Sequence, residues 1–278
     1  MRIEKTVWMA LAGAAVLINL AAAQDRISVP FRDPARPGTL VVNVSRGGLT
    51  VKGYNGKEIQ IEATAINDPR NNNPSPRGRG REVPPGMHRI DAAFGQLDVV
   101  EDNNVVTVQA GRTRAEDLTI QVPQNTALKL RVMSGGKLAV EGVAGEIDVN
   151  NMNGDVAIRG ASGAVLAHSN NGKVEVGFTQ FPADKPVSVT TMNGDIDLSL
   201  PSDAKAKLMM KTENGDIVTD FDIRIDPTAN APIVTDERAK NGRYRVTRGR
   251  TLTGTINGGG REVQITSYNG RLTIQKNK

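Results

Sequence analysis

Residues 136–176 read GKLAVEGVAGEIDVNNMNGDVAIRGASGAVLAHSNNGKVEV, and this stretch decides the fold. Glycine recurs in it at every ninth position, namely Gly136, Gly145, Gly154, Gly163 and Gly172. Two and four residues after each glycine stands an aliphatic residue, as in Leu138/Val140 and Ile147/Val149, and the residue between is mostly polar. Alternation with a period of two predicts short strands that each bury one face, so the chain is expected to be all-β.

The residue at each turn is glycine, often preceded by asparagine and followed by aspartate. We single out Asn153, Gly154, Asp155, Asn193, Gly194, Asp195, Asn214, Gly215, Asp216, Asn269 and Gly270 as turn and ladder residues. Asn-Gly between alternating strands also predicts hairpins, so a meander or sandwich is the alternative fold. We favour a parallel β-helix-like solenoid, because stacked coils require units of equal length with the same side chain at the same offset.

The glycine spacing also predicts how the coils stack. Gly194 follows Gly172 by 22 residues and precedes Gly215 by 21, which predicts a coil of about that length with two or more strands. Asparagines at matching offsets are expected to hydrogen-bond in a ladder, and the three aspartates of the turns are expected to be neighbours. The strands within residues 263–274 are expected to close the array.

The N-terminus predicts export. Arg2 and Lys5 precede an apolar segment at 7–20, and three alanines at 21–23 resemble a cleavage site, so residues 1–23 are predicted to be a signal peptide. An uncleaved membrane anchor is the alternative. No later segment is apolar enough to span a membrane, so we expect the mature protein in the periplasm, at the cell surface or outside the cell.

The remaining chain divides into a linker at 24–38 and a solenoid at 39–275. Two insertions interrupt the solenoid, a disordered Arg/Pro-rich segment at 67–89 and a basic loop at 226–250. Candidate anion-contacting residues within them are Arg77, Arg79, Arg81, Arg243, Arg245 and Arg248, since the guanidinium group binds carboxylate, phosphate or sulfate. Charge runs of this kind more often only solvate a loop.

Composition excludes several classes of chemistry. The chain of 278 residues has no cysteine, which excludes disulfides, thiolate metal sites and a lipid-modified cysteine, and it has only two histidines. A net charge of +5 and 3% aromatic residues argue against nucleic-acid binding. We predict no catalytic residues, no metal site and no cofactor. A calcium-binding β-roll is an alternative reading of the turn aspartates, but Lys137, Lys173 and Arg271 stand at the equivalent offset.

The recurring motif at 153–158, 193–198 and 214–218, Asn-Gly-Asp followed by Val or Ile, resembles the bacterial putative-adhesin family of repeat domains of unknown function. The resemblance covers about residues 39–275. It implies a β-solenoid and defines no catalytic residues. We therefore expect a non-catalytic envelope module that binds a surface ligand, such as an anionic glycan, or scaffolds an envelope protein. A β-helix enzyme acting on acidic polysaccharides is the alternative.

Overall fold

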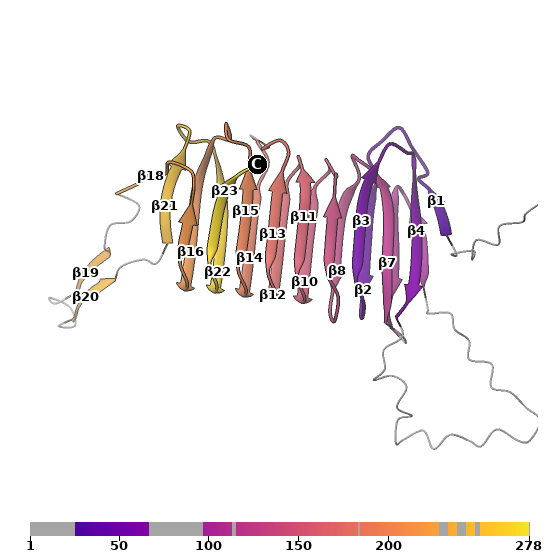
Figure 1. Cartoon of the computed structure of the whole chain (residues 1–278), viewed down its shortest axis with the longest axis horizontal. Helices are drawn as coiled ribbons and strands as arrows, with labels where there is room; N and C mark the ends of the chain where they lie inside the picture. The colour runs from indigo at the N-terminus through magenta and orange to yellow at the C-terminus, as the bar shows by residue number, and fades with distance from the viewer. Residues whose placement is uncertain are drawn as a thin grey trace, which may run out of the picture.

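The computed structural model describes residues 26–66, 97–112, 115–182, 184–227, 233–237, 243–247 and 251–277. Every regular element in these ranges is a β-strand, so the predicted all-β solenoid is confirmed (Figure 1). The predicted signal peptide at 1–23 and the Arg/Pro-rich insertion at 67–89 lie outside the described residues. Within the described ranges, no helix is long and apolar enough to cross a membrane.

Two large parallel-rich sheets make up the solenoid, which we call sheet A and sheet B. In spatial order, the described strands of sheet A are β1 (Arg26–Pro30), β4 (Glu58–Ala65), β7 (Glu116–Pro123), β3 (Leu49–Tyr54), β9 (Leu138–Glu141), β11 (Val156–Ala161), β13 (Val174–Phe178), β15 (Ile196–Leu200), β23 (Leu272–Lys276) and β17 (Ile217–Thr219). Those of sheet B are β18 (Arg224–Ile225), β21 (Thr251–Ile256), β16 (Ala206–Asn214), β22 (Arg261–Asn269), β14 (Val187–Asn193), β12 (Val165–Asn171), β10 (Ile147–Asn153), β8 (Ala127–Val132), β2 (Thr39–Val44), β6 (Val105–Ala110) and β5 (Asp98–Asp102).

Each central coil contributes one strand to each sheet, so the nine-residue unit is half a coil. In sheet A, Val156 pairs with Val174, and Val174 pairs with Ile196, all in parallel register. The matching residues of neighbouring coils are 18 residues apart in the first case and 22 in the second, as the contacts between coils show. Equivalent side chains therefore stack in rows that run along the long axis of Figure 1.

Chain order and stacking order differ at both ends of the solenoid. The C-terminal coil, β22–β23, lies between β14–β15 and β16–β17. Likewise the first coil, β2–β3, lies between β6–β7 and β8–β9. The prediction that residues 263–274 close the array is therefore wrong. Every coil carries the same apolar pattern. The chain can therefore double back and insert a coil between two others without changing the register of the strands.

Antiparallel strands cover both ends of sheet B and one end of sheet A, whose other edge is the three-residue β17. β1 pairs with β4 and β4 with β7 in sheet A, and β5 pairs with β6 in sheet B. At the other end, β21 pairs antiparallel with β16 and with the two-residue β18. Short edge strands reduce pairing with other chains. The predicted linker at 24–38 thus contains β1, and the predicted loop at 226–250 contains the antiparallel pair β19 (Ile233–Glu237) and β20 (Arg243–Thr247).

Rows of aliphatic side chains fill the space between the sheets. Sheet B contributes Leu128, Ile147, Val165, Val187, Val263 and Leu208. Sheet A contributes Leu138, Val156, Val174, Ile196 and Leu272. All of these are at most 2% exposed and belong to one buried cluster. Burying each such side chain contributes about 1.5–3 kcal/mol, so the stacked rows carry the stability of a chain with few aromatic residues.

Candidate interaction surfaces

The Asn-Gly turns form one corner of the solenoid, where strands of sheet B end and the chain crosses to sheet A. The side-chain amides there form a continuous ladder. The donor and acceptor pairs, Nδ2 to Oδ1, are Asn171 to Asn153 (2.9 Å), Asn193 to Asn171 (2.9 Å), Asn269 to Asn193 (2.7 Å) and Asn214 to Asn269 (2.8 Å). We call these five side chains the Asn ladder.

Close packing of the coils requires glycine at this corner. A β-carbon at Gly172 would lie 2.1 Å from the carbonyl oxygen of Gly154, and one at Gly194 would lie 2.0 Å from that of Gly172. Both glycines also have positive φ, at +135° and +153°. The Asn-Gly recurrence therefore reflects contact between coils as well as the turn itself.

Hydroxyl groups just inside the corner donate to the carbonyls of two other turn glycines. Ser267 donates to the Gly194 oxygen at 3.0 Å, and Thr212 donates to the Gly270 oxygen at 3.0 Å. Ser267 is fully buried, where an unpaired hydroxyl would be costly. The turns at Gly194 and Gly270 are thus each fixed by a side chain from the neighbouring coil.

Charges alternate along the row that follows the turn glycines. In stacking order the row reads Lys137, Asp155, Lys173, Asp195, Arg271 and Asp216, as the backbone bonds between successive coils define. Asp155 accepts a hydrogen bond from the Lys173 amide at 2.9 Å, and Asp195 accepts one from the Arg271 amide at 2.8 Å. The prediction that the three aspartates are neighbours is therefore wrong. A cation lies between each pair, which also removes the basis for a calcium ladder.

Within this row of charges, Lys173 forms two ion pairs. Its Nζ lies 2.6 Å from Asp197 and 2.8 Å from Glu175, both on sheet A. These hydrogen bonds, with Asp197 the larger cause, raise the pKa of Lys173. The same contact with Lys173 lowers the pKa of Glu175, with a smaller contribution from Arg159. The charges are matched within the sheet, so they serve the stability of the coils and leave little net charge for a ligand.

The outer face of sheet B carries an apolar strip beside the Asn ladder. Met133, Met152, Met192 and Tyr268 are 44–56% exposed, and each occupies the same offset in its coil. Three of them immediately precede a ladder asparagine. Asn170 stands at this offset in the one intervening coil. We call these four side chains the Met/Tyr strip.

The described residues hold no cluster of three or more histidine, aspartate or glutamate side chains that could bind a metal. The ring nitrogens of His168 contact Thr190 Oγ1 at 2.8 Å and Asn170 Oδ1 at 3.1 Å. A hollow of about 300 Å³ lies near Phe31, Tyr54 and Thr126, and its lining has no carboxylate and no histidine. That hollow therefore lacks the acid–base pair of a glycosidase.

Of the six predicted anion-contacting arginines, two lie within the described residues. Arg243 and Arg245 lie on β20, opposite Glu237 and Thr235. Arg77, Arg79, Arg81 and Arg248 lie outside the described residues. Their role as an anion site stays a prediction.

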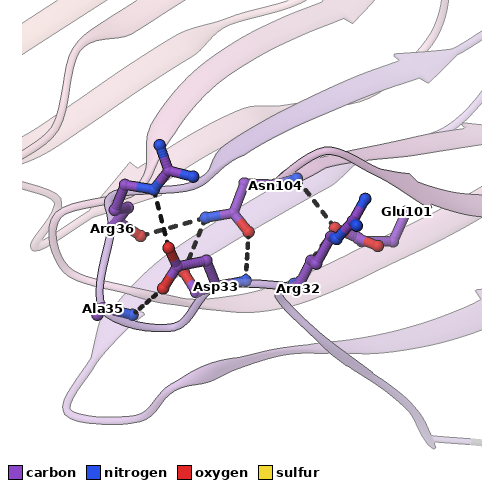
Figure 2. Close-up of polar contacts among 6 residues, drawn as sticks. All are labelled: Arg32, Asp33, Ala35, Arg36, Glu101 and Asn104. Carbon is purple, nitrogen blue, oxygen red and sulfur yellow. Dashed lines mark hydrogen bonds and ion pairs between the residues drawn. The ribbon is translucent and has the colours of Figure 1, made fainter.

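A polar cluster fastens the N-terminal segment to the β5–β6 hairpin (Figure 2). Asn104 accepts a hydrogen bond from the Asp33 amide at 2.7 Å and donates to the Asp33 carbonyl at 2.8 Å. Glu101 Oε1 accepts from the Asn104 amide at 3.0 Å and from the Arg32 amide at 3.3 Å. The Asp33 carboxylate binds Arg36, which lowers the pKa of Asp33. All of these hydrogen-bond partners belong to the protein itself, so the cluster serves to hold the N-terminal segment against the β5–β6 hairpin.

Most of the chain matches the model of a known protein family. The model of the family described as Toastrack DUF4097 matches residues 95–275, about two thirds of the chain. The chain belongs to the Toastrack family. No curated protein sequence matches it.

This Toastrack chain is also similar to solved bacterial structures. A putative cell adhesion protein from Clostridium sporogenes is 11% identical with a TM-score of 0.43, covering 91% of this chain and 99% of that one. A putative adhesin from Bacteroides fragilis is 11% identical with a TM-score of 0.27, covering 92% and 98%.

The Toastrack match begins beyond the first coil, yet that coil is an internal part of the stack. β2 lies between β6 and β8, both of which fall within the matched residues. Leu40 pairs with Val106 on one side and with Leu128 on the other, and it is fully buried. The structural unit therefore extends N-terminal to the matched residues.

Sequence reasoning missed the Met/Tyr strip. Its signal was present, because the residue before Asn-Gly is Met152, Met192 or Tyr268 in three turns. At a two-residue period these positions fall on the polar face, so an apolar residue there departs from the pattern. Recurrence of that departure at one offset was the available clue to an exposed surface.

Proposed function

We propose that this Toastrack protein is a non-catalytic, exported, adhesin-like binding module of the bacterial envelope, and that it binds through the outer face of sheet B. The observation that carries the proposal is the Met/Tyr strip. Its four large apolar side chains are about half exposed and lie in one row on a rigid sheet.

The chemistry of the strip suits a binding role. Methionine is flexible and polarizable and is favoured at binding surfaces, and tyrosine is enriched at interfaces. The Asn ladder lies beside the strip and fixes the backbone there, so little order has to be gained when a partner binds. Equal spacing of the coils repeats the contact, which allows many weak interactions to add.

Several features support a role without catalysis. Three of the charged groups with shifted pKa values are paired within the protein, Lys173 with Glu175 and Asp33 with Arg36. Both nitrogens of His168 have partners. For the partner, an envelope protein or an extended surface polymer fits a long, uncharged strip. The Arg/Pro-rich insertion at 67–89 offers a separate route to anionic glycans.

The test uses the purified mature chain against envelope extracts and arrays of neutral and anionic glycans. Met152→Glu with Met192→Glu should reduce binding at least about tenfold, because charge is placed in the contact. Val218→Glu is the matched control, since Val218 is 41% exposed at the far edge of sheet A. If binding survives the double variant but is lost on deletion of 67–89, the binding site is the arginine-rich insertion and not the Met/Tyr strip. Cell fractionation tests export.

A further inference from the structure

The Asn ladder contains the dipeptide that is chemically most prone to deamidation. In Asn-Gly the backbone nitrogen of glycine attacks the preceding side-chain amide, because glycine has no side chain to hinder the approach. The reaction requires the glycine N–H to lose its proton and the asparagine side chain to rotate toward it. Hydrogen bonds to either group oppose the reaction.

Inside the ladder both groups are held. At Asn193-Gly194, the Gly194 N–H donates to the Asn269 carbonyl at 2.9 Å. The Asn193 amide donates to Asn171 and its Oδ1 accepts from Asn269, at 2.9 and 2.7 Å. The same bonds recur at Asn171-Gly172 and at Asn269-Gly270. At Asn153-Gly154, the Asn153 Oδ1 accepts a hydrogen bond from the Asn171 side chain, and the Gly154 N–H donates to the Asn171 carbonyl.

The ladder ends at Asn214, and there the protection is incomplete. Asn214 donates to Asn269 at 2.8 Å, but its Oδ1 accepts no hydrogen bond from the described residues. The Gly215 N–H likewise has no acceptor among them, whereas the four other ladder glycines each have one. All five ladder asparagines are exposed to solvent, so these two hydrogen bonds are what distinguishes Asn214.

We propose that Asn214 is a site of spontaneous deamidation and that stacking protects the other four ladder asparagines. The Gly215 nitrogen forms a bond to Cγ of Asn214, the Cγ–Nδ2 bond breaks, and ammonia leaves. Water then opens the succinimide to aspartate or isoaspartate. Neither product has an amide to donate to Asn269 Oδ1, so the modification removes the last bond of the ladder and makes Asn269 its new end.

The stacking order of the coils determines which ladder asparagine deamidates fastest. Asn269 lies nearer the C-terminus of the chain than Asn214, yet it is internal in the ladder because β22 lies between β14 and β16. Chain position alone would have named Asn269 as the exposed end.

Peptide mapping measures all five sites at once. Cleavage after lysine and arginine places the ladder asparagines on separate peptides, 138–159, 160–173, 174–205, 212–224 and 262–271. The folded protein is incubated at mildly alkaline pH and 37 °C, digested at acidic pH, and each peptide is followed by mass spectrometry. The protein in urea gives the unprotected rate of every site.

In urea the five sites should react at similar rates. In the folded protein Asn214 should react about tenfold or more faster than Asn171, Asn193 or Asn269, since the described residues do not supply two of the protecting hydrogen bonds to it. Asn214→Asp mimics the product and should raise the rate at Asn269. The proposal is overturned if Asn214 reacts no faster than Asn193 in the folded protein, or if all sites react as they do in urea.

Discussion

Substituting the central turn glycine, Gly172→Ala, tests the stacking argument most directly. The new β-carbon would lie 2.1 Å from the Gly154 oxygen, and real contacts of this kind do not fall below 3.0 Å. The two coils must therefore separate by about 0.9 Å at the corner. Hydrogen bonds now near 2.9 Å would then exceed the length at which they stabilise.

Four hydrogen bonds of 2.9 Å or less join these two coils at the corner. They are Gly154 N–H to the Asn171 oxygen (2.9 Å), Val156 N–H to the Lys173 oxygen (2.8 Å), Lys173 N–H to Asp155 Oδ1 (2.9 Å) and Asn171 Nδ2 to Asn153 Oδ1 (2.9 Å). At about 1 kcal/mol each, losing them costs about 4 kcal/mol. The φ of +135° adds about 1–2 kcal/mol for alanine. We expect the free energy of unfolding to fall by about 5–6 kcal/mol.

Urea unfolding followed by circular dichroism measures the total loss in free energy of unfolding. Amide hydrogen exchange at Gly154 and Val156 shows where in the solenoid the loss occurs, because repeat arrays unfold in parts. Gly135→Ala is the control for backbone strain alone, since Gly135 has φ +94° and no atom within 4 Å of the added carbon. It should cost only about 1–2 kcal/mol. Equal losses for Gly172→Ala and Gly135→Ala would refute the close-packing explanation.

Three further changes probe the core, the charge row and a buried carboxyl. Leu198→Ala should cost about 2–5 kcal/mol in urea unfolding, because Leu198 is fully buried; a loss under 1 kcal/mol would contradict the core assignment. Arg271→Asp places three carboxylates in consecutive coils and should cost about 1 kcal/mol, recovered in high salt, whereas Arg271→Lys should not. Burial raises the pKa of Glu116, partly opposed by a backbone hydrogen bond from Gly111, so the folded state holds the proton more tightly than the unfolded state. The native protein should therefore gain stability relative to Glu116→Gln as pH falls from 7 to 4, and a pH-independent difference would exclude this.

The central coils were predictable because each level of the pattern agrees. Period-two alternation placed Ile147 and Val149 on the buried face, and the nine-residue recurrence brought equivalent valines into parallel register, as at Val156 and Val174. The Met/Tyr strip was harder to predict, because single exposed apolar residues are common and only stacking turns them into a row.

The chain ends were not predictable from the same pattern. The antiparallel caps β1, β5 and β21 have no repeat to identify them, and they form by covering edges that exist only after the coils have stacked. The predicted linker at 24–38 contained a strand for this reason.

The sequence by itself determined the building unit, an alternating strand closed by Asn-Gly, since local sterics and side-chain periodicity suffice for it. Only the tertiary structure decided the order in which the units stack. Coils with the same apolar rows fit any neighbour equally well, so the contacts of the whole chain choose among them. Placing β22–β23 between β14–β15 and β16–β17 put Arg271 between Asp195 and Asp216 and left Asn214 at the end of the ladder.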